Sequence, residues 1–137
     1  MAEINRLRAL VEQNPNDRDA LRQLANLNYD IANWPRAQEL YERYLKLDPD
    51  NPDVLTDLGI TLRSQGQLDR ALELFRRAEK LKPDHWQARF NEIVVLAFDR
   101  RDFAGAEKAL AELERLAPGN PDVGRLAQEV RKLKEGG

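Results

Sequence analysis

Prolines recur along this chain at an almost constant interval. The successive intervals are 34, 34 and 35 residues, and the prolines concerned are Pro15, Pro49, Pro83 and Pro118. Aligned without gaps, residues 18–51 and 52–85 are identical at 12 of 34 positions, whereas common residues would coincide by chance at about two or three. Because a fixed period of about 20–50 residues marks stacked structural repeats, the sequence predicts an array of small units.

Each repeat carries the pattern of two helices. In residues 52–85, Leu55, Leu58 and Leu62 share one helical face, because they follow the spacing i, i+3 and i+7. Gly66 then interrupts the pattern at a point where a left-handed residue would end a helix. A second apolar stripe follows, and no run of alternating β-branched residues indicates a strand. We expect helices at 2–13, 17–31, 35–47, 52–64, 69–81, 87–99, 103–116 and 121–134.

Helix starts are marked by capping residues. The tripeptide Asn-Pro-Asp occurs at residues 51–53 and again at 120–122. An asparagine at the cap, a proline in the first turn and a carboxylate near the positive end of the helix dipole all favour a helix start. These motifs therefore predict the first residues of two of the expected helices.

The repeats resemble the tetratricopeptide repeat, whose 34-residue pattern fixes apolar, small and closing proline positions. The matching residues of the second repeat are Leu55, Leu58, Gly59, Leu62, Ala71, Phe75, Ala78 and Pro83. In the first repeat, Asn28 stands where an aromatic residue is usual. The resemblance implies an all-α fold, a right-handed α-solenoid of antiparallel helix pairs, in one domain over residues 1–137. Its expected parts are an N-terminal half-repeat helix (2–15), three repeats (18–51, 52–85 and 86–120) and a capping helix (121–134).

The third repeat holds one extra residue, which leaves two registers open for its first helix. If the extra residue lies in the turn before Phe103, Arg89 and Glu92 take buried positions. If it lies near Trp86, the buried residues are Phe90, Ile93, Val94 and Ala97. Because burying an unpaired charge is costly, we favour the second register. The first resembles family members with a longer loop between the helices.

The composition leaves little enzyme chemistry available. The chain has no cysteine and one histidine, His85, which excludes disulfides, thiolate nucleophiles and sites that need paired histidines. His85 lies at a turn between repeats, where we expect a capping or solvated residue. The acidic run at 48–53 lacks the glycine and the distant glutamate of a calcium loop. We therefore predict no catalytic residue, no cofactor and no metal site.

Charge and hydropathy narrow the range of partners. Lys and Arg number 22 and Asp and Glu number 24, for a net charge of −2; this near balance argues against nucleic-acid binding, which needs a basic face. No apolar stretch approaches the roughly 18 residues of a membrane span, and the first residues lack the apolar core of a signal peptide. We expect a soluble chain without membrane insertion, and its composition suits cytoplasm and periplasm alike.

The resemblance also implies a binding surface, because the first helices of such repeats line a concave groove. The residues at groove positions are Arg22, Asn26, Tyr29, Thr56, Ile60, Arg63, Asn91, Val95 and Phe98. Apolar side chains in this set would supply contact area, and the amide and guanidinium groups would orient a peptide backbone. We expect a non-catalytic adaptor or scaffold that binds a peptide or helix of a partner protein, with Asn26 and Arg63 free of any packing role.

One specialised use of the groove is disfavoured by the residues. Some tetratricopeptide domains hold the C-terminal carboxylate of chaperones with a set of Lys, Asn and Arg side chains. Arg22 and Asn26 match the first two of these positions, but Asp57 occupies the next, and the last two carry no cation in either register. An anion facing an anion argues against a chaperone-tail clamp.

The N-terminal segment suggests an alternative function. Ile4, Leu7, Leu10 and Val11 share one face, as in the second helix of a repeat whose first helix is missing. The helix is either a natural N-terminal cap or the start of a fragment of a longer parent; we favour the fragment, and in that case we expect the stripe to be partly exposed. Because an exposed apolar stripe promotes association, the alternative is a self-assembling scaffold that homo-oligomerises through this terminal helix.

Overall fold

The computed structural model describes residues 2–136, which form eight α-helices, one π-helical turn and no β-strand. The elements are α1 (Ala2–Gln13), α2 (Arg18–Asp30), α3 (Trp34–Leu47), α4 (Pro52–Ser64), α5 (Leu68–Leu81), α6 (Trp86–Val94), the π-helix η1 (Val95–Asp99), α7 (Phe103–Leu116) and α8 (Pro121–Gly136). The expected helix boundaries are confirmed to within two residues, with the sixth helix continued by η1.

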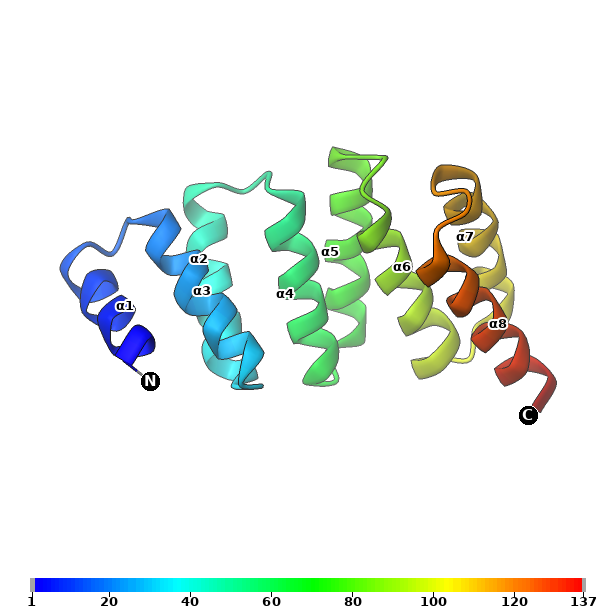
Figure 1. Cartoon of the computed structure of the whole chain (residues 1–137), viewed down its shortest axis with the longest axis horizontal. Helices are drawn as coiled ribbons and strands as arrows, with labels where there is room; N and C mark the ends of the chain where they lie inside the picture. The colour runs from blue at the N-terminus through cyan, green and yellow to red at the C-terminus, as the bar shows by residue number, and fades with distance from the viewer. Residues whose placement is uncertain (1, 137) are drawn as a thin grey trace.

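The helices stack as an elongated array with the two termini at opposite ends (Figure 1). Within repeats, α2 packs against α3, α4 against α5 and α6 against α7; between repeats, α3 contacts α4 and α5 contacts α6. The first helices α4 and α6 also touch each other directly. This arrangement confirms an all-α solenoid of antiparallel helix pairs.

The expected caps hold several helix starts. The Asn51 side chain accepts a hydrogen bond from the Val54 amide at 3.2 Å, and the Asn120 side chain accepts one from the Asp122 amide at 2.9 Å. Asp17 caps α2 in the same way. Each bond satisfies a backbone donor that lacks a partner inside the helix, so short polar residues between the repeats fix where each helix begins.

The turns inside the three repeats share one backbone conformation. Gly66 has a φ of 78°, and the matching residues Ala32 and Arg101 have φ values of 58° and 53°. Glycine adopts this left-handed region without steric cost, whereas a residue with a Cβ is strained there. The same turn is therefore built from glycine once and from strained residues twice.

Close packing inside the second repeat depends on a small residue facing a large one. A Cβ atom added to Gly59 of α4 would lie 2.4 Å from the ring of Phe75 in α5, and Phe75 is fully buried. The first repeat has Ala25 and Tyr41 at the matching positions, and both are buried as well. The pairing of a small with an aromatic residue thus sets how closely the two helices approach.

The sixth helix shows that the preferred register of the third repeat is wrong for the first half of that helix. Glu92 is buried and Arg89 is largely buried. Unpaired burial would be costly, but Arg76 Nε donates to Glu92 Oε2 at 2.7 Å, and Arg89 Nη1 lies 3.4 Å from Glu79 Oε1. These contacts lower the cost that argued against the first register, although Glu79 Oε2 and Arg89 Nε remain buried without a partner among the described residues.

The extra residue of the third repeat is absorbed by η1. The Arg100 amide donates to the Val95 carbonyl, five residues back, at 3.0 Å, whereas an α-helix joins residues four apart. The buried face consequently advances by one residue, and residues 95–97 are all buried. Of the residues in the preferred register, Ile93 and Ala97 are buried, and Phe90 and Val94 are only partly so.

The N-terminal helix is less exposed than the sequence predicts. Leu7 is 1% exposed and Val11 is 3% exposed, because α1 packs against α2 and joins the main core. Ile4 and Leu10 are partly buried against the same core. The expectation of a partly exposed stripe is therefore wrong for Leu7 and Val11, the two residues at its centre.

Candidate functional site

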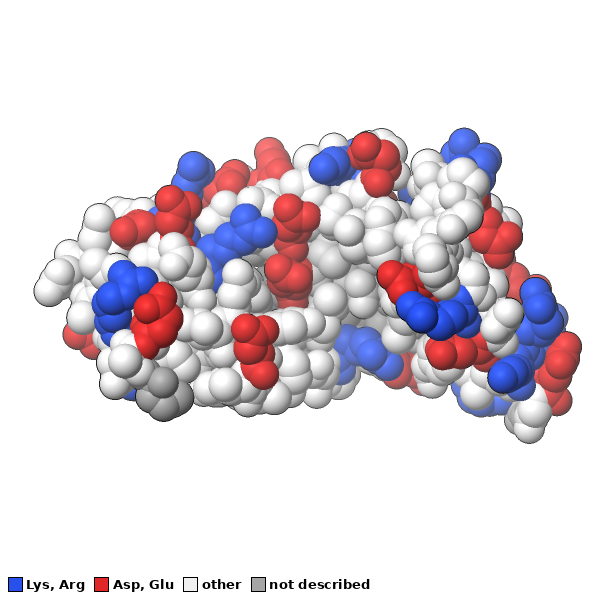
Figure 2. All heavy atoms as spheres, in the orientation of Figure 1, with Lys and Arg blue, Asp and Glu red and all other residues white. Residues whose placement is uncertain are grey.

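A hollow of about 270 Å³ lies where the N-terminal half of α2, the start of α4 and the start of α6 meet. We call it the α2–α4–α6 hollow, and its lining residues are Arg22, Asp53, Thr56, Asp57, His85 and Gln87. On this face of the molecule, basic side chains over α2 lie beside acidic side chains over α4, and an uncharged band follows between α4 and α6 (Figure 2). The hollow is thus polar, and it adjoins a less polar surface.

Two carboxylates and one guanidinium set the charge of this hollow. Arg22 Nη2 lies 3.9 Å from Asp53 Oδ2, which is too far for a hydrogen bond. Burial raises the pKa of Asp57 to about 6, with Arg22 opposing the rise and Asp53 adding to it. Since one positive group faces two acidic groups, the hollow carries an excess of negative charge at neutral pH.

His85 is the N-cap residue of α6, but its ring forms no cap hydrogen bond. We expected a capping or a solvated residue here: His85 does occupy the cap position, but it is 8% exposed and therefore not solvated. The ring points to α4, where Nε2 lies 3.1 Å from the Thr56 hydroxyl. Burial lowers the pKa of His85, and the nearby Asp53 carboxylate offsets this only in part. The ring is therefore neutral at neutral pH.

Aromatic residues surround the groove positions of the first repeat. The Tyr29 and Trp34 rings meet edge to face, with centroids 5.3 Å apart. The Tyr41 hydroxyl donates to Asn26 Oδ1 at 2.6 Å. Asn26 therefore supports the buried Tyr41, and the expectation that it has no packing role is wrong.

Arg63 also has a structural partner. Its Nε and Nη2 atoms donate to the two carboxylate oxygens of Asp99 at 2.6 and 3.0 Å. This forked pair joins the end of α4 to η1, and hydrogen bonding to Asp99 raises the pKa of Arg63. The expectation that Arg63 is free of structural contacts is wrong as well.

The nine groove residues inferred from the sequence differ in accessibility. Phe98 is 37% exposed, whereas Val95 is fully buried and Thr56 is 4% exposed. Val95 lies on the inner face because η1 shifts the register, so it offers no surface to a partner. The partly exposed members of the set are Arg22, Asn26, Tyr29, Ile60, Arg63 and Asn91.

Sequence reasoning missed part of the surface. Phe90 and Val94 are partly exposed on α6, and they occupy groove positions in the register that we rejected. Asp53 and His85 line the hollow, yet their positions beside helix starts suggested only capping. The sequence could have indicated Asp53, because Asp53 and Asp57 are four residues apart and therefore lie on the same face of α4.

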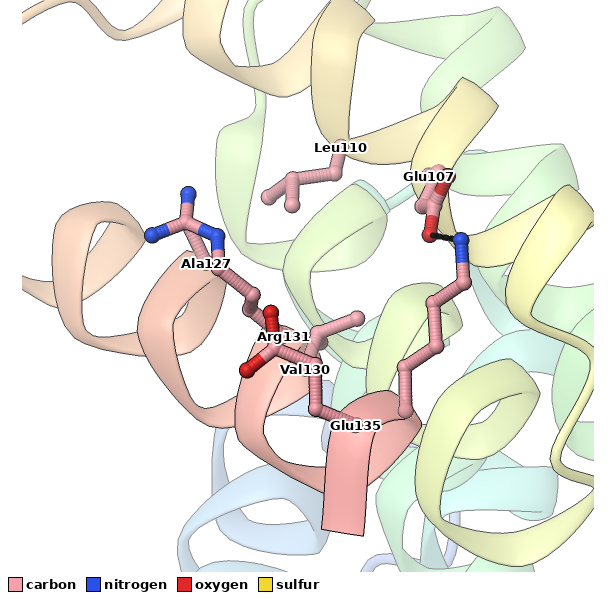
Figure 3. A pocket seen from close by; sticks show the side chains of 7 residues that line it. Glu107, Leu110, Ala127, Val130, Arg131 and Glu135 are labelled. Atoms are coloured by element: carbon pink, nitrogen blue, oxygen red, sulfur yellow. Dashed lines mark hydrogen bonds and ion pairs between the residues drawn. The ribbon is translucent and has the colours of Figure 1, made fainter. Parts of the chain in front are cut away.

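Larger hollows lie elsewhere: one of about 500 Å³ lies at the turn between α7 and α8, and two others contain ion-paired side chains. Of these two, one of about 540 Å³ separates α7 from α8, with Leu110 and Val130 on opposite sides and Lys134 bonded to Glu107 at 2.8 Å (Figure 3). Another of about 520 Å³ lies among α5, α6 and α7 over the ion pairs of Glu79 and Glu92. None of the three lies on the groove face formed by α2 and α4.

The part of the chain that the structure describes contains no group of three His, Cys, Asp or Glu side chains placed to hold a metal ion. None of its helices combines the length and the apolar character needed to cross a membrane.

Stacked helix pairs with a hollow across their first helices define an α-solenoid built from helical-hairpin repeats. The tetratricopeptide repeat model matches residues 4–52, 22–83 and 56–121. The chain therefore belongs to the tetratricopeptide repeat family, which confirms the resemblance seen in the sequence. No curated protein matched in sequence.

Solved structures with the same fold support this assignment. The crystal structure of MamA superposes with a TM-score of 0.80 at 18% identity, covering 96% of this chain and 78% of that one. The first tetratricopeptide domain of Spaghetti (RPAP3), bound to the Hsp90 peptide SRMEEVD, gives 0.76 at 18%, covering 87% and 91%. The Yersinia enterocolitica secretion chaperone SycD, in complex with a peptide of the translocator YopD, gives 0.75 at 20%, covering 86% and 89%. At these identities the likeness establishes the fold.

Proposed function

We propose that this chain is a non-catalytic interaction module that binds a peptide or helix of a partner protein along the face formed by α2, α4 and α6. The observation that carries the proposal is the row of accessible apolar side chains on these helices. Tyr29 of α2 and Ile60 of α4 are partly exposed, and Phe98, in the η1 turn that continues α6, is 37% exposed. Accessible apolar groups beside polar ones are the usual composition of a peptide-binding groove.

Two structural neighbours support this use of the fold. The Spaghetti domain and SycD were each solved with a bound peptide. A segment that becomes ordered on binding loses conformational freedom, so we expect micromolar affinity, roughly −8 kcal/mol. The partner supplies the apolar anchors, and this chain supplies a preformed surface.

Self-assembly through the terminal helix is the alternative function; burial of Leu7 and Val11 reduces the apolar surface on which it was based to the partly exposed Ile4 and Leu10. An enzyme is disfavoured by the composition, since the single histidine forms its hydrogen bond to Thr56 and has no serine or cysteine nucleophile beside it. An adaptor therefore accounts for the accessible groove better than either alternative.

The test begins with selection of 12-residue peptides from a random phage-displayed library on the whole chain. The groove variant is I60E/F98E, and the matched control is L47E/L81E, because Leu47 and Leu81 are exposed to 38% and 41% on the second helices. We expect the selected peptides to bind the control like the wild type and to lose at least about tenfold in affinity for the groove variant. Equal binding by wild type and groove variant, with loss in the control, would place the site on the other face.

A further inference from the structure

Two hydrogen-bond acceptors face each other in the α2–α4–α6 hollow. The Thr56 hydroxyl donates its proton to the Pro52 carbonyl at 2.8 Å. The opposite tautomer would have the Thr56 hydroxyl donate to His85 Nε2, 3.1 Å away, instead; we adopt the tautomer in which Nε2 carries the ring proton and donates to the hydroxyl oxygen. The neutral ring then has its lone pair on Nδ1, and Nδ1 lies 3.6 Å from Asp53 Oδ1. No donor from the described residues is recorded between these two acceptors.

This arrangement is unusual because the histidine is so deeply buried. The His85 side chain is 7% exposed, yet Nδ1 is not among the fully buried unpaired atoms, because the ring lines the hollow; a partner that covered Nδ1 without supplying a donor would therefore cost free energy. Protonation of Nδ1 would convert the contact with Asp53 into an ion pair, but burial lowers the pKa of His85 and keeps the ring neutral. A donor from outside the chain would satisfy both acceptors at once.

The charges around the two acceptors favour a cationic donor. Asp57 lines the same hollow, and its carboxylate acts with Asp30 to raise the pKa of Tyr29 and of Tyr41, after burial. Arg22 is the cation of the hollow, but it lies 3.9 Å from the other oxygen of Asp53 and is itself 36% exposed. The Asp53 side chain remains 60% exposed, so an incoming group reaches it from solvent.

We propose that the α2–α4–α6 hollow binds a lysine or arginine side chain of the partner peptide, whose N–H groups bridge Asp53 and His85 Nδ1. Asp57 supplies the second negative charge against which the cation is held, and charge-assisted bonds of this kind are stronger than neutral ones. The proposal rests on the proposed function, because it assigns one subsite within the peptide groove. A carboxylate clamp binds an anionic peptide end, whereas this hollow would bind a cationic side chain, because an anionic end would be repelled by Asp53 and Asp57.

The first test examines the free protein, and it needs no ligand. His85 is the single histidine of the chain, so the ring nitrogen resonances in a long-range ¹H–¹⁵N NMR spectrum belong to it without ambiguity. We expect the neutral tautomer with the proton on Nε2 at pH 7. A proton on Nδ1, in the neutral or the charged ring, would fill the gap beside Asp53 and would overturn the proposal.

The second test uses the peptides selected on the whole chain. We expect them to share one basic residue, to lose about tenfold or more in affinity when that residue becomes Glu, and to shift the His85 Nδ1 resonance on binding. D53N should weaken binding by a similar factor. D122N is the matched control, because Asp122 follows the same Asn-Pro pair at the start of α8, and it should leave the affinity unchanged.

The outcomes separate the two proposals. Peptides that depend on Ile60 and Phe98 but share no basic residue, or bind D53N as tightly as D122N, overturn the cationic subsite and leave the proposed groove intact. Selected peptides that bind I60E/F98E unchanged overturn both. Thermal unfolding of D53N and D122N shows whether loss of a first-turn carboxylate changes stability equally in the two helices.

Discussion

A cluster of four charged side chains joins α5 to α6 at the scale of single residues. Arg76 pairs with Glu92, and Arg89 pairs with Glu79, while Glu79 Oε2 and Arg89 Nε are buried without a hydrogen-bond partner among the described residues. Burial, and then the Glu92 carboxylate, raises the pKa of Glu79 to about 8. The negative charge of Glu79 is therefore unfavourable in the folded protein. At pH 7 the carboxyl is mostly protonated, and it becomes mostly ionised only as the pH rises above about 8.

Replacing Glu79 by Gln tests this charge. A carboxyl whose pKa is higher in the folded than in the unfolded protein stabilises the fold most when protonated. We expect the free energy of unfolding of the wild type to fall as pH rises from about 6.5 to about 8, above the range where His85 and Asp57 titrate. Glu79→Gln should flatten this slope. Urea titrations at several pH values measure it, and the exposed Glu73→Gln on the same helix is the control.

The turn residues give a second prediction at this scale. Ala32 has a φ of 58°, so Ala32→Gly should raise the free energy of unfolding by about 0.5–1 kcal/mol, because relief of strain exceeds the entropy that glycine loses. Gly66→Ala should lower it by about 1 kcal/mol. A Cβ at Gly66 meets nothing within 4 Å, so the effect there comes from the backbone alone. Opposite signs in chemical denaturation confirm the argument, and equal signs contradict it.

At the scale of elements, η1 explains why one repeat departs from the pattern. The Arg100 amide bonds to the Val95 carbonyl five residues back, so the buried face advances by one residue and residues 95–97 are all buried. The sequence shows that one residue is extra, because the proline interval grows from 34 to 35. The sequence does not show where the extra residue lies, because a π-turn in the helix and a longer loop after it would give the same 35-residue interval. The ion pairs of Arg89 and Glu92 were equally hidden, because their partners lie 10 and 16 residues away in the chain.

Deleting Phe98 tests the role of η1. The deletion restores the 34-residue period, so residues 86–97 and those after them can continue as an α-helix. We expect the free energy of unfolding to change by less than about 1 kcal/mol, with the helical circular dichroism signal retained. Deleting Ser64, at the matching position of the regular second repeat, should cost about 2 kcal/mol or more because no spare residue is present. Similar losses in both deletions would mean that η1 is required.

At the scale of the whole molecule, the repeat period and the apolar spacing were enough to predict the fold. Leu55, Leu58 and Phe75 are buried as their spacing requires, because stacked repeats bury the same face each time. The site was less predictable. The contact between His85 and Thr56 joins residues 29 positions apart, and nothing in either local sequence marks it. Burial of Leu7 and Val11 likewise depends on how α1 lies against α2.

The last prediction concerns association of the whole chain. Because Leu7 and Val11 are buried within one molecule, α1 offers no large apolar stripe to a second copy, and light scattering should give a constant monomer mass across a concentration series. Leu7→Glu places a charge in the core and should lower the free energy of unfolding by about 3–5 kcal/mol. The exposed Arg8→Glu on the same helix is the control. A concentration-dependent dimer that Leu7→Glu abolishes while the fold persists would contradict this packing and restore the self-assembling scaffold.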